Sequence, residues 1–152
     1  MKRTLTAIAL LLAGSTSAFS ANAAWEVFHD NDSMGKMCAL SEKSLEGASD
    51  LQFAQRAGQN ITALYVYEKL GAEGVRPSMT INGVVVAAEG EVFTDSSGVE
   101  HVQYVMPFVS SNVRAVNTFL NGGIVQINNS AYDATGFKQA FKELVKCASQ
   151  SF

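Results

Sequence analysis

SMTINGVVVA, residues 78–87, is the stretch that decides the fold class of this chain. Two runs suited to strands, Ser78–Ile81 and Val84–Ala87, flank the dipeptide Asn82-Gly83. Both central positions of a type I′ turn need positive φ, which asparagine and glycine adopt more readily than other residues. The stretch therefore predicts a tight β-hairpin, and with it an antiparallel sheet.

Further strand candidates lie on both sides of this hairpin. Each pair is rich in apolar, β-branched or aromatic residues and is separated by turn-forming residues. The predicted pairs are Trp25–His29 with Met37–Leu40, Leu51–Gln55 with Ile61–Tyr67, and Val92–Thr94 with Val99–Val105. A single strand is expected at Ile124–Ile127, before a turn at Asn128–Ser130.

The hydrophobic period lengthens to three or four in two segments near the C-terminus, which predicts helices. The first should be capped by Ser110 or Ser111 and end at Gly122-Gly123, with a core face of Val113, Val116, Phe119 and Leu120. The second should run from about Thr135 to Ala148, with a core face of Phe137, Phe141, Leu144, Val145 and Ala148. The element order predicts an α+β fold, mainly an antiparallel β-sandwich or partly open barrel with two helices in the C-terminal third.

The N-terminus has the layout of a secretory signal peptide. A basic start at Lys2-Arg3 precedes the apolar run Leu5–Gly14, and Ala21-Asn22-Ala23 matches a small-x-small cleavage site. Residues 1–23 are therefore expected to be a signal peptide and residues 24–152 a single globular domain. The apolar run is shorter than the roughly 20 residues of a membrane-spanning helix, so we expect export to the periplasm or beyond the cell and no membrane span.

The charge of the chain argues against a nucleic acid as its partner. Without Lys2 and Arg3, 9 of the 11 basic residues remain against 14 acids, which gives a net charge of −5. The charges are scattered, and the basic patch that nucleic-acid binding requires is missing. We expect a protein partner rather than a nucleic acid.

Cys38 and Cys147 are the only two cysteines. In an oxidising compartment such a pair most simply forms a disulfide. The alternative is a reactive free thiol, which needs a nearby base or cation; Lys36 and Lys146 lie close in sequence, but no CxxC or Cys-His pattern is present. We expect the disulfide to tie the last helix to the first hairpin.

The segment His29–Cys38 gathers acids, a histidine and a cysteine, which raises the question of a metal site. Its start resembles a calcium loop, but Met34 and Ser41 occupy positions where that loop needs oxygen ligands, the twelfth being a glutamate. Zinc would require His29 and His101 to converge, because a disulfide would remove both thiolates. We expect a turn here, and neither a metal nor a cofactor.

The sequence also lacks recognisable catalytic motifs. No nucleophile elbow or phosphate-binding loop is present, and no carboxylate pair stands out. An enzyme is therefore not expected. A small periplasmic hydrolase stays open as an alternative, which would be favoured if His29 and His101 lay close to each other, or either lay close to a carboxylate in a cleft.

Aromatic residues offer a candidate binding surface. Tyr65 and Tyr67 share one face of a strand by the period of two, and Tyr104 lies in another strand. If exposed together, the three would form a patch for a ligand or protein; otherwise they pack in the sheet.

The layout as a whole resembles small exported proteobacterial proteins of the invasion-associated locus B type. The residues that carry the resemblance are Trp25 near the cleavage site, Met37–Leu40, Thr80–Val84, Asn121–Gly123 and the helix Gly136–Cys147. The family tends to hold more than one cysteine in its N-terminal half, and this chain departs from that pattern. The resemblance implies an envelope protein linked to host-cell entry, and it supplies no catalytic residues.

These observations predict a non-enzymatic binding or interaction protein, periplasmic or secreted, with one disulfide. An inhibitor or immunity protein directed against a hydrolase or toxin is an alternative, because the acidic surface would suit a basic target. The sequence leaves the partner and the oligomeric state open.

Overall fold

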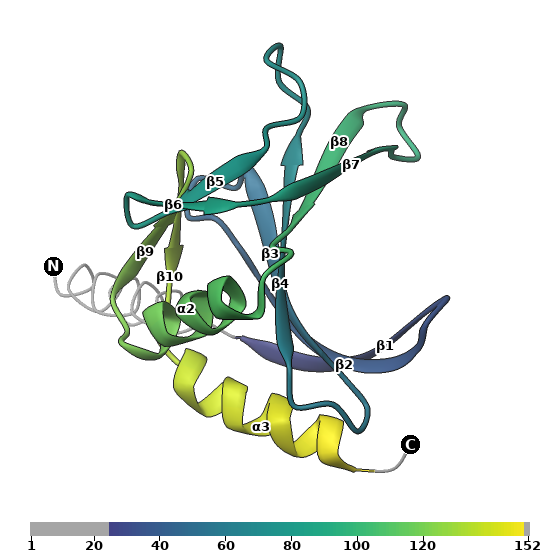
Figure 1. Cartoon of the computed structure of the whole chain (residues 1–152), viewed down its shortest axis with the longest axis vertical. Helices are drawn as coiled ribbons and strands as arrows, with labels where there is room; N and C mark the ends of the chain where they lie inside the picture. The colour runs from purple at the N-terminus through teal and green to yellow at the C-terminus, as the bar shows by residue number, and fades with distance from the viewer. Residues whose placement is uncertain (1–24, 151–152) are drawn as a thin grey trace, which may run out of the picture.

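The structure is a computed structural model that describes residues 25–150 (Figure 1). Two antiparallel sheets and two helices make up this part of the chain. The α+β class is thereby confirmed, in a sandwich-like arrangement in which neither sheet closes into a barrel. The predicted signal peptide, residues 1–23, lies outside the described residues.

The larger sheet has six strands in the order β1-β2-β3-β4-β8-β7, and every neighbouring pair is antiparallel. The three hairpins predicted for this region are confirmed; most of the strands extend further than predicted, whereas β8 begins one residue later. The bounds are β1 Glu26–Asp32, β2 Gly35–Lys43, β3 Ser49–Arg56, β4 Thr62–Lys69, β7 Glu89–Thr94 and β8 Glu100–Val105.

The smaller sheet contains the hairpin at Asn82-Gly83. Its order is β10-β9-β5-β6, with β5 Ser78–Ile81, β6 Val84–Ala87, β9 Ile124–Ile127 and β10 Ser130–Asp133. Asn82 and Gly83 have φ values of 47° and 79°, as the type I′ turn requires. Strand β10 was not predicted; the expected turn Asn128–Ser130 ends one residue earlier, with Asn128 at φ 51° and Ser130 already paired with Ile127.

Helix α2 (Val109–Leu120) differs from expectation in its cap and its buried face. Phe108 occupies the N-cap position and no side chain caps the helix, so the predicted serine cap is wrong. The buried residues are Asn112, Ala115 and Phe119, whereas Val113 is 52% exposed. The predicted face is confirmed for Phe119, which is buried, and for Val116 and Leu120, which pack against the core. It is wrong for Val113, and it missed the polar Asn112, which is directed inward.

Helix α3 (Phe137–Ser149) follows Gly136 and buries Phe137, Ala140, Leu144 and Ala148. The prediction is wrong for Val145, which is 40% exposed, and it overlooked Ala140. None of the helices within residues 25–150 is long and apolar enough to cross a membrane.

The core lies between the inner face of the six-stranded sheet, the smaller sheet and the two helices. Four aromatic rings form its centre: Trp25, Phe53, Phe119 and Phe137, with centroid separations of 4.8–6.2 Å between contacting pairs. The predicted disulfide is confirmed, since Cys38 in β2 is bonded to Cys147 in α3. These contacts fix the sheet from its inner side. On the opposite face Met37, Ala39 and Ala54 form a second, small buried cluster.

Candidate functional site

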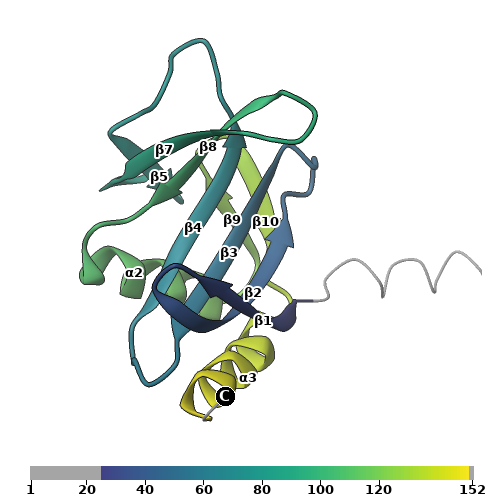
Figure 2. The ribbon, with the colours of Figure 1, turned by 90° about the vertical axis from the view of Figure 1, so that its right-hand side faces the viewer.

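A concavity lies on the outer face of the six-stranded sheet. In Figure 2 the hairpins β1-β2 and β7-β8 project on either side of strands β3 and β4, which form the floor. A cavity of about 640 Å³ occupies this region. We call it the trough; its lining residues are Phe28, Asp30, Ser41, Glu42, Lys43, Asp50, Leu51, Gln52, Tyr67, Phe93, Asp95 and His101.

The floor of the trough follows from strand register. Asp50 in β3 lies opposite Lys43 in β2 on one side and Tyr67 in β4 on the other. Tyr67 in turn lies opposite Gln103 in β8. Because directly opposed residues in antiparallel strands point to the same face, these four side chains form a continuous row across the sheet.

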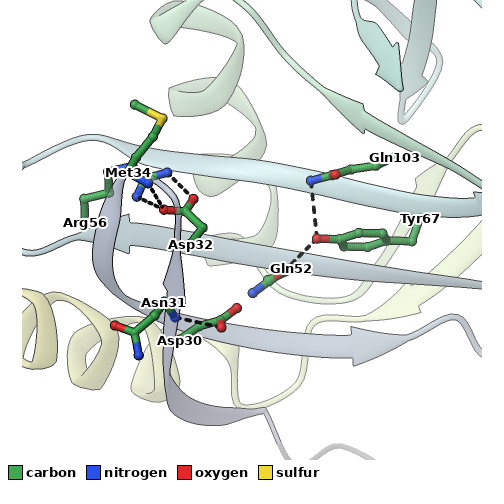
Figure 3. Close-up of polar contacts among 8 residues, drawn as sticks. All are labelled: Asp30, Asn31, Asp32, Met34, Gln52, Arg56, Tyr67 and Gln103. Carbon is green, nitrogen blue, oxygen red and sulfur yellow. Dashed lines mark hydrogen bonds and ion pairs between the residues drawn. The ribbon is translucent and has the colours of Figure 1, made fainter. Parts of the chain in front are cut away.

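Tyr67 is fixed in the middle of this row. Its hydroxyl donates to Gln52 Oε1 at 2.9 Å and accepts a longer hydrogen bond of 3.5 Å from Gln103 Nε2 (Figure 3). Partial burial raises the pKa of Tyr67 to about 12, so the phenol is neutral near pH 7. Its ring meets Phe93 edge to face, with centroids 6.4 Å apart. Tyr67 is thus a neutral aromatic side chain held by two hydrogen bonds.

His101 and Asp95 form a pair at the β7-β8 side of the trough. His101 Nε2 lies 2.7 Å from Asp95 Oδ2, and the imidazole stacks on Phe93 at 5.5 Å. Asp95 Oδ1 also accepts hydrogen bonds from the Ser97 hydroxyl and from the backbone N–H groups of Ser97 and Val99. The Ser97 hydroxyl foremost, then the Val99 amide and His101, hold the pKa of Asp95 well below its usual range. This carboxylate is ionised and shapes the β7-β8 turn.

Carboxylates dominate the charges of the trough. Asp30, Glu42, Asp50 and Asp95 line it, against one permanent cation, Lys43, and the titratable His101. Partial burial raises the pKa of Glu42. Phe28 and Phe93, at 37% and 40% exposure, present apolar surface on the two flanking hairpins.

The acids of the first hairpin are held by protein groups and do not form a calcium loop. Asp32 makes a bidentate ion pair with Arg56 and also accepts a hydrogen bond from the backbone N–H of Met34 (Figure 3). Hydrogen bonding to Arg56 lowers the pKa of Asp32 to about 2. Asp30 Oδ1 accepts from the backbone N–H of Asn31. Strands β1 and β2 continue through most of His29–Cys38, which leaves only Ser33-Met34 between them.

His29 lies far from the trough residue His101 in the fold. It pairs with Cys38 in the β1-β2 ladder, on the inner face, whereas His101 is on the outer face. A ring nitrogen of His29 lies 3.9 Å from Cys147 Sγ, so three candidate ligand atoms gather within 4.8 Å. Both sulfurs are bonded to each other, which removes them as metal ligands. The convergence of His29 and His101 needed for zinc is not found.

The predicted tyrosine patch is wrong for one of its three members. Tyr65 and Tyr67 share the outer face, with Tyr65 packed near Met37 and Ala54. Tyr104 is 1% exposed on the inner face, and its hydroxyl accepts from the backbone N–H of Arg76 at 3.1 Å. Only Tyr67 of the three lines the trough.

Several residues that line the trough were not predicted as site residues from the sequence: Phe28, Asp50, Gln52, Phe93 and Asp95. Hairpin register was the signal that could have found some of them. Once the β3-β4 pairing is known, the position of Asp50 beside Tyr67 follows. The curvature that brings Phe28 and Phe93 to one cavity is a property of the whole sheet and has no local motif.

Comparison with known protein families, with curated proteins and with solved structures finds no match. The site is therefore interpreted from its own geometry.

Proposed function

We propose that this chain is an exported, non-enzymatic binding protein, periplasmic or secreted, that holds a partner protein in the trough. The observation that supports this most directly is the open cavity of about 640 Å³ on a disulfide-linked sheet, lined by aromatic, amide and carboxylate groups. Binding sites commonly combine apolar and aromatic surface with a few fixed polar groups. The trough has both, and Tyr67 is held by two hydrogen bonds before any partner arrives.

The contacts within the trough favour binding over nucleophilic catalysis. Within residues 25–150, the only hydrogen-bond partner of His101 is Asp95, so the imidazole is not bonded to a serine, threonine or tyrosine hydroxyl. The nearest such hydroxyl in the turn, that of Ser97, donates to Asp95 instead. A triad requires the base to contact the nucleophile and to be oriented by the acid. His101 is oriented by Asp95 but contacts no nucleophile in the described part of the chain. The contact between Asp95 and His101 instead stabilises the β7-β8 hairpin.

The proposed location follows from the sequence. The signal peptide layout of residues 1–23 directs export, and an oxidising compartment would maintain the Cys38–Cys147 bond. Membership of the invasion-associated locus B type, with an envelope role, is part of the same proposal and rests on the layout resemblance alone.

The test is capture of a partner with and without access to the trough. Ser41 is exposed on the outer face and lines the trough, so Ser41→Trp should fill it without disturbing the core. Val85→Trp is the matched control, because Val85 is 67% exposed on the smaller sheet. Immobilised wild type and Val85→Trp should enrich the same protein from envelope extract and host-cell material, and Ser41→Trp should not. Equal enrichment by all three would refute binding in the trough.

A small periplasmic hydrolase is the second candidate, and the 2.7 Å contact between His101 and Asp95 is the observation that favours it. His101→Gln separates the two functions. Hydrolysis of ester, peptide or glycan substrates by the wild type that this variant abolishes would establish the hydrolase. Retained partner capture with no hydrolysis by either protein supports the binding protein.

A further inference from the structure

We infer that the trough recognises a segment of its partner protein that carries lysine or arginine side chains. The inference rests on the proposed function, since it names the chemistry of the partner at the same site. Three features of the trough point to it: carboxylates outside the ion pairs of the fold, aromatic faces and an open shape.

The carboxylates of Asp30 and Asp50 are available to a ligand. Ion pairs within residues 25–150 include Asp32–Arg56, Glu68–Arg76, Glu73–Arg76 and Asp95–His101. Neither Asp30 nor Asp50 belongs to any of them, although Lys43 lies directly opposite Asp50 in the sheet. A cation entering between the two hairpins would meet two carboxylates that lie outside these ion pairs.

Aromatic rings supply the second feature. Tyr67 and Phe93 meet edge to face, Phe93 is 40% exposed, and Phe28 lines the trough from the β1 side. Ammonium and guanidinium groups bind the faces of such rings, and their aliphatic stems cover apolar surface. Lysine and arginine therefore satisfy both the carboxylates and the rings, whereas a neutral sugar would leave the negative charge uncompensated.

The shape of the trough favours a protein segment over a free amine as the ligand. A small-molecule site encloses most of its ligand, whereas the trough lies between two hairpins and is not enclosed. An open site of about 640 Å³ suits a chain that crosses the surface and inserts side chains. The net charge of −5 expected for residues 24–152 would also attract a basic partner.

The test measures binding of defined probes to the disulfide-bonded mature protein by fluorescence anisotropy. The probes are a labelled octapeptide alternating lysine and alanine, its arginine, glutamine and glutamate counterparts, spermidine and a peptidoglycan-type tetrasaccharide. The lysine and arginine peptides should bind, and binding should weaken as NaCl rises from 25 to 300 mM. Equal binding of the glutamine peptide, tetrasaccharide binding without lysine-peptide binding, spermidine competing mole for mole with the peptide, or no binding at all would overturn the inference.

Variants locate the interaction. Asp30→Asn and Asp50→Asn should each weaken lysine-peptide binding about threefold, and together about tenfold, as expected for partly exposed charge pairs. Phe93→Leu should weaken it about threefold through loss of an aromatic face. Glu143→Gln, which removes an exposed acid from α3, is the matched control and should bind as the wild type does. An equal loss in Glu143→Gln would show only general charge attraction and refute recognition by the trough.

These results are independent of the capture experiment. If Ser41→Trp abolishes partner capture while the peptides show no charge preference, the trough is the binding site but its partner is not selected by lysine or arginine. If Ser41→Trp captures the partner normally, the proposed function itself fails.

Discussion

Cys38, fully buried in the middle of β2, is covalently joined to Cys147 near the end of α3, at a sequence separation of 109 residues. The bond links the first hairpin to the last helix, so the two ends of the described chain are fastened together. Strand β2 also contributes Ser41 and Lys43 to the trough. The disulfide therefore stabilises the sheet on whose outer face the trough lies.

Reducing this bond should destabilise the whole domain. Closing a loop of this length restricts the unfolded chain and stabilises the fold by about 4–5 kcal/mol in the chain-entropy description. We expect the free energy of unfolding in urea to fall by about that amount on treatment with dithiothreitol. The double variant Cys38→Ser/Cys147→Ser should show a similar loss without reductant, and the same free energy for oxidised and reduced wild type would contradict the prediction.

The aromatic centre of the core should dominate stability at the helix-sheet contact. Phe137 is fully buried, and its ring lies 5.0 Å from Trp25 and 4.8 Å from Phe53. Phe137→Ala should lower the free energy of unfolding by about 3–5 kcal/mol because it opens a large cavity. Trp25 is the only tryptophan, so its fluorescence reports the transition directly. Phe141→Ala, a partly buried neighbour in α3, should lose clearly less.

The ion pair between Asp32 and Arg56 should make stability depend on pH. The pKa of Asp32 is about 2 in the folded protein against an ordinary value of 3.8, so folding favours the charged carboxylate. Its contribution is complete above about pH 5 and is lost as the pH falls through about 2. Wild type should therefore melt above Asp32→Asn at pH 7, and the two melting temperatures should converge near pH 2. A difference that persists unchanged at pH 2, or one unaffected by 1 M NaCl, would contradict the ion-pair explanation.

The hairpins were predictable because their determinants are local. Asn82-Gly83 needs only its own two φ angles, and the two-residue period of β4 is visible in Ile61–Tyr67. The burial of Asn112 in α2, in place of Val113, was not predictable in this way. Its apolar residues alone favoured Val113, whereas the observed face is set by bonds from Asn112 to backbone groups in β4 and the preceding loop.

The candidate site was predictable only in part. Tyr67 was identified from the period of its own strand, but membership of the trough depends on six strands and on the bend between them. Tyr104 was misplaced because the sequence does not show which face of β8 is inward; its neighbour in β4 is the buried Val66. The two cysteines were correctly paired because the chain has no others.

Asn112 should prove the least replaceable polar residue of α2. It is 6% exposed; its Oδ1 accepts from the Leu64 N–H at 2.9 Å, and its Nδ2 donates to the carbonyls of Met106 and Phe108. Asn112→Ala would leave these buried backbone groups without partners, so the free energy of unfolding should fall by about 3 kcal/mol. Asn117→Ala, at an exposed position of the same helix, should change it by less than about 1 kcal/mol.

The substitution Asn112→Asp should make the free energy of unfolding depend on pH. An ionised carboxylate there could accept from Leu64 but would face the carbonyl oxygens of Met106 and Phe108, to which only a donor is suited. Folding would therefore favour the protonated form and raise the pKa of the introduced carboxyl. The variant should be strongly destabilised at pH 7 and regain part of the loss as the pH falls toward 4, the opposite direction to the effect of Asp32. Urea unfolding at both pH values checks this, and a loss that does not change with pH would show that Asn112 acts by shape alone.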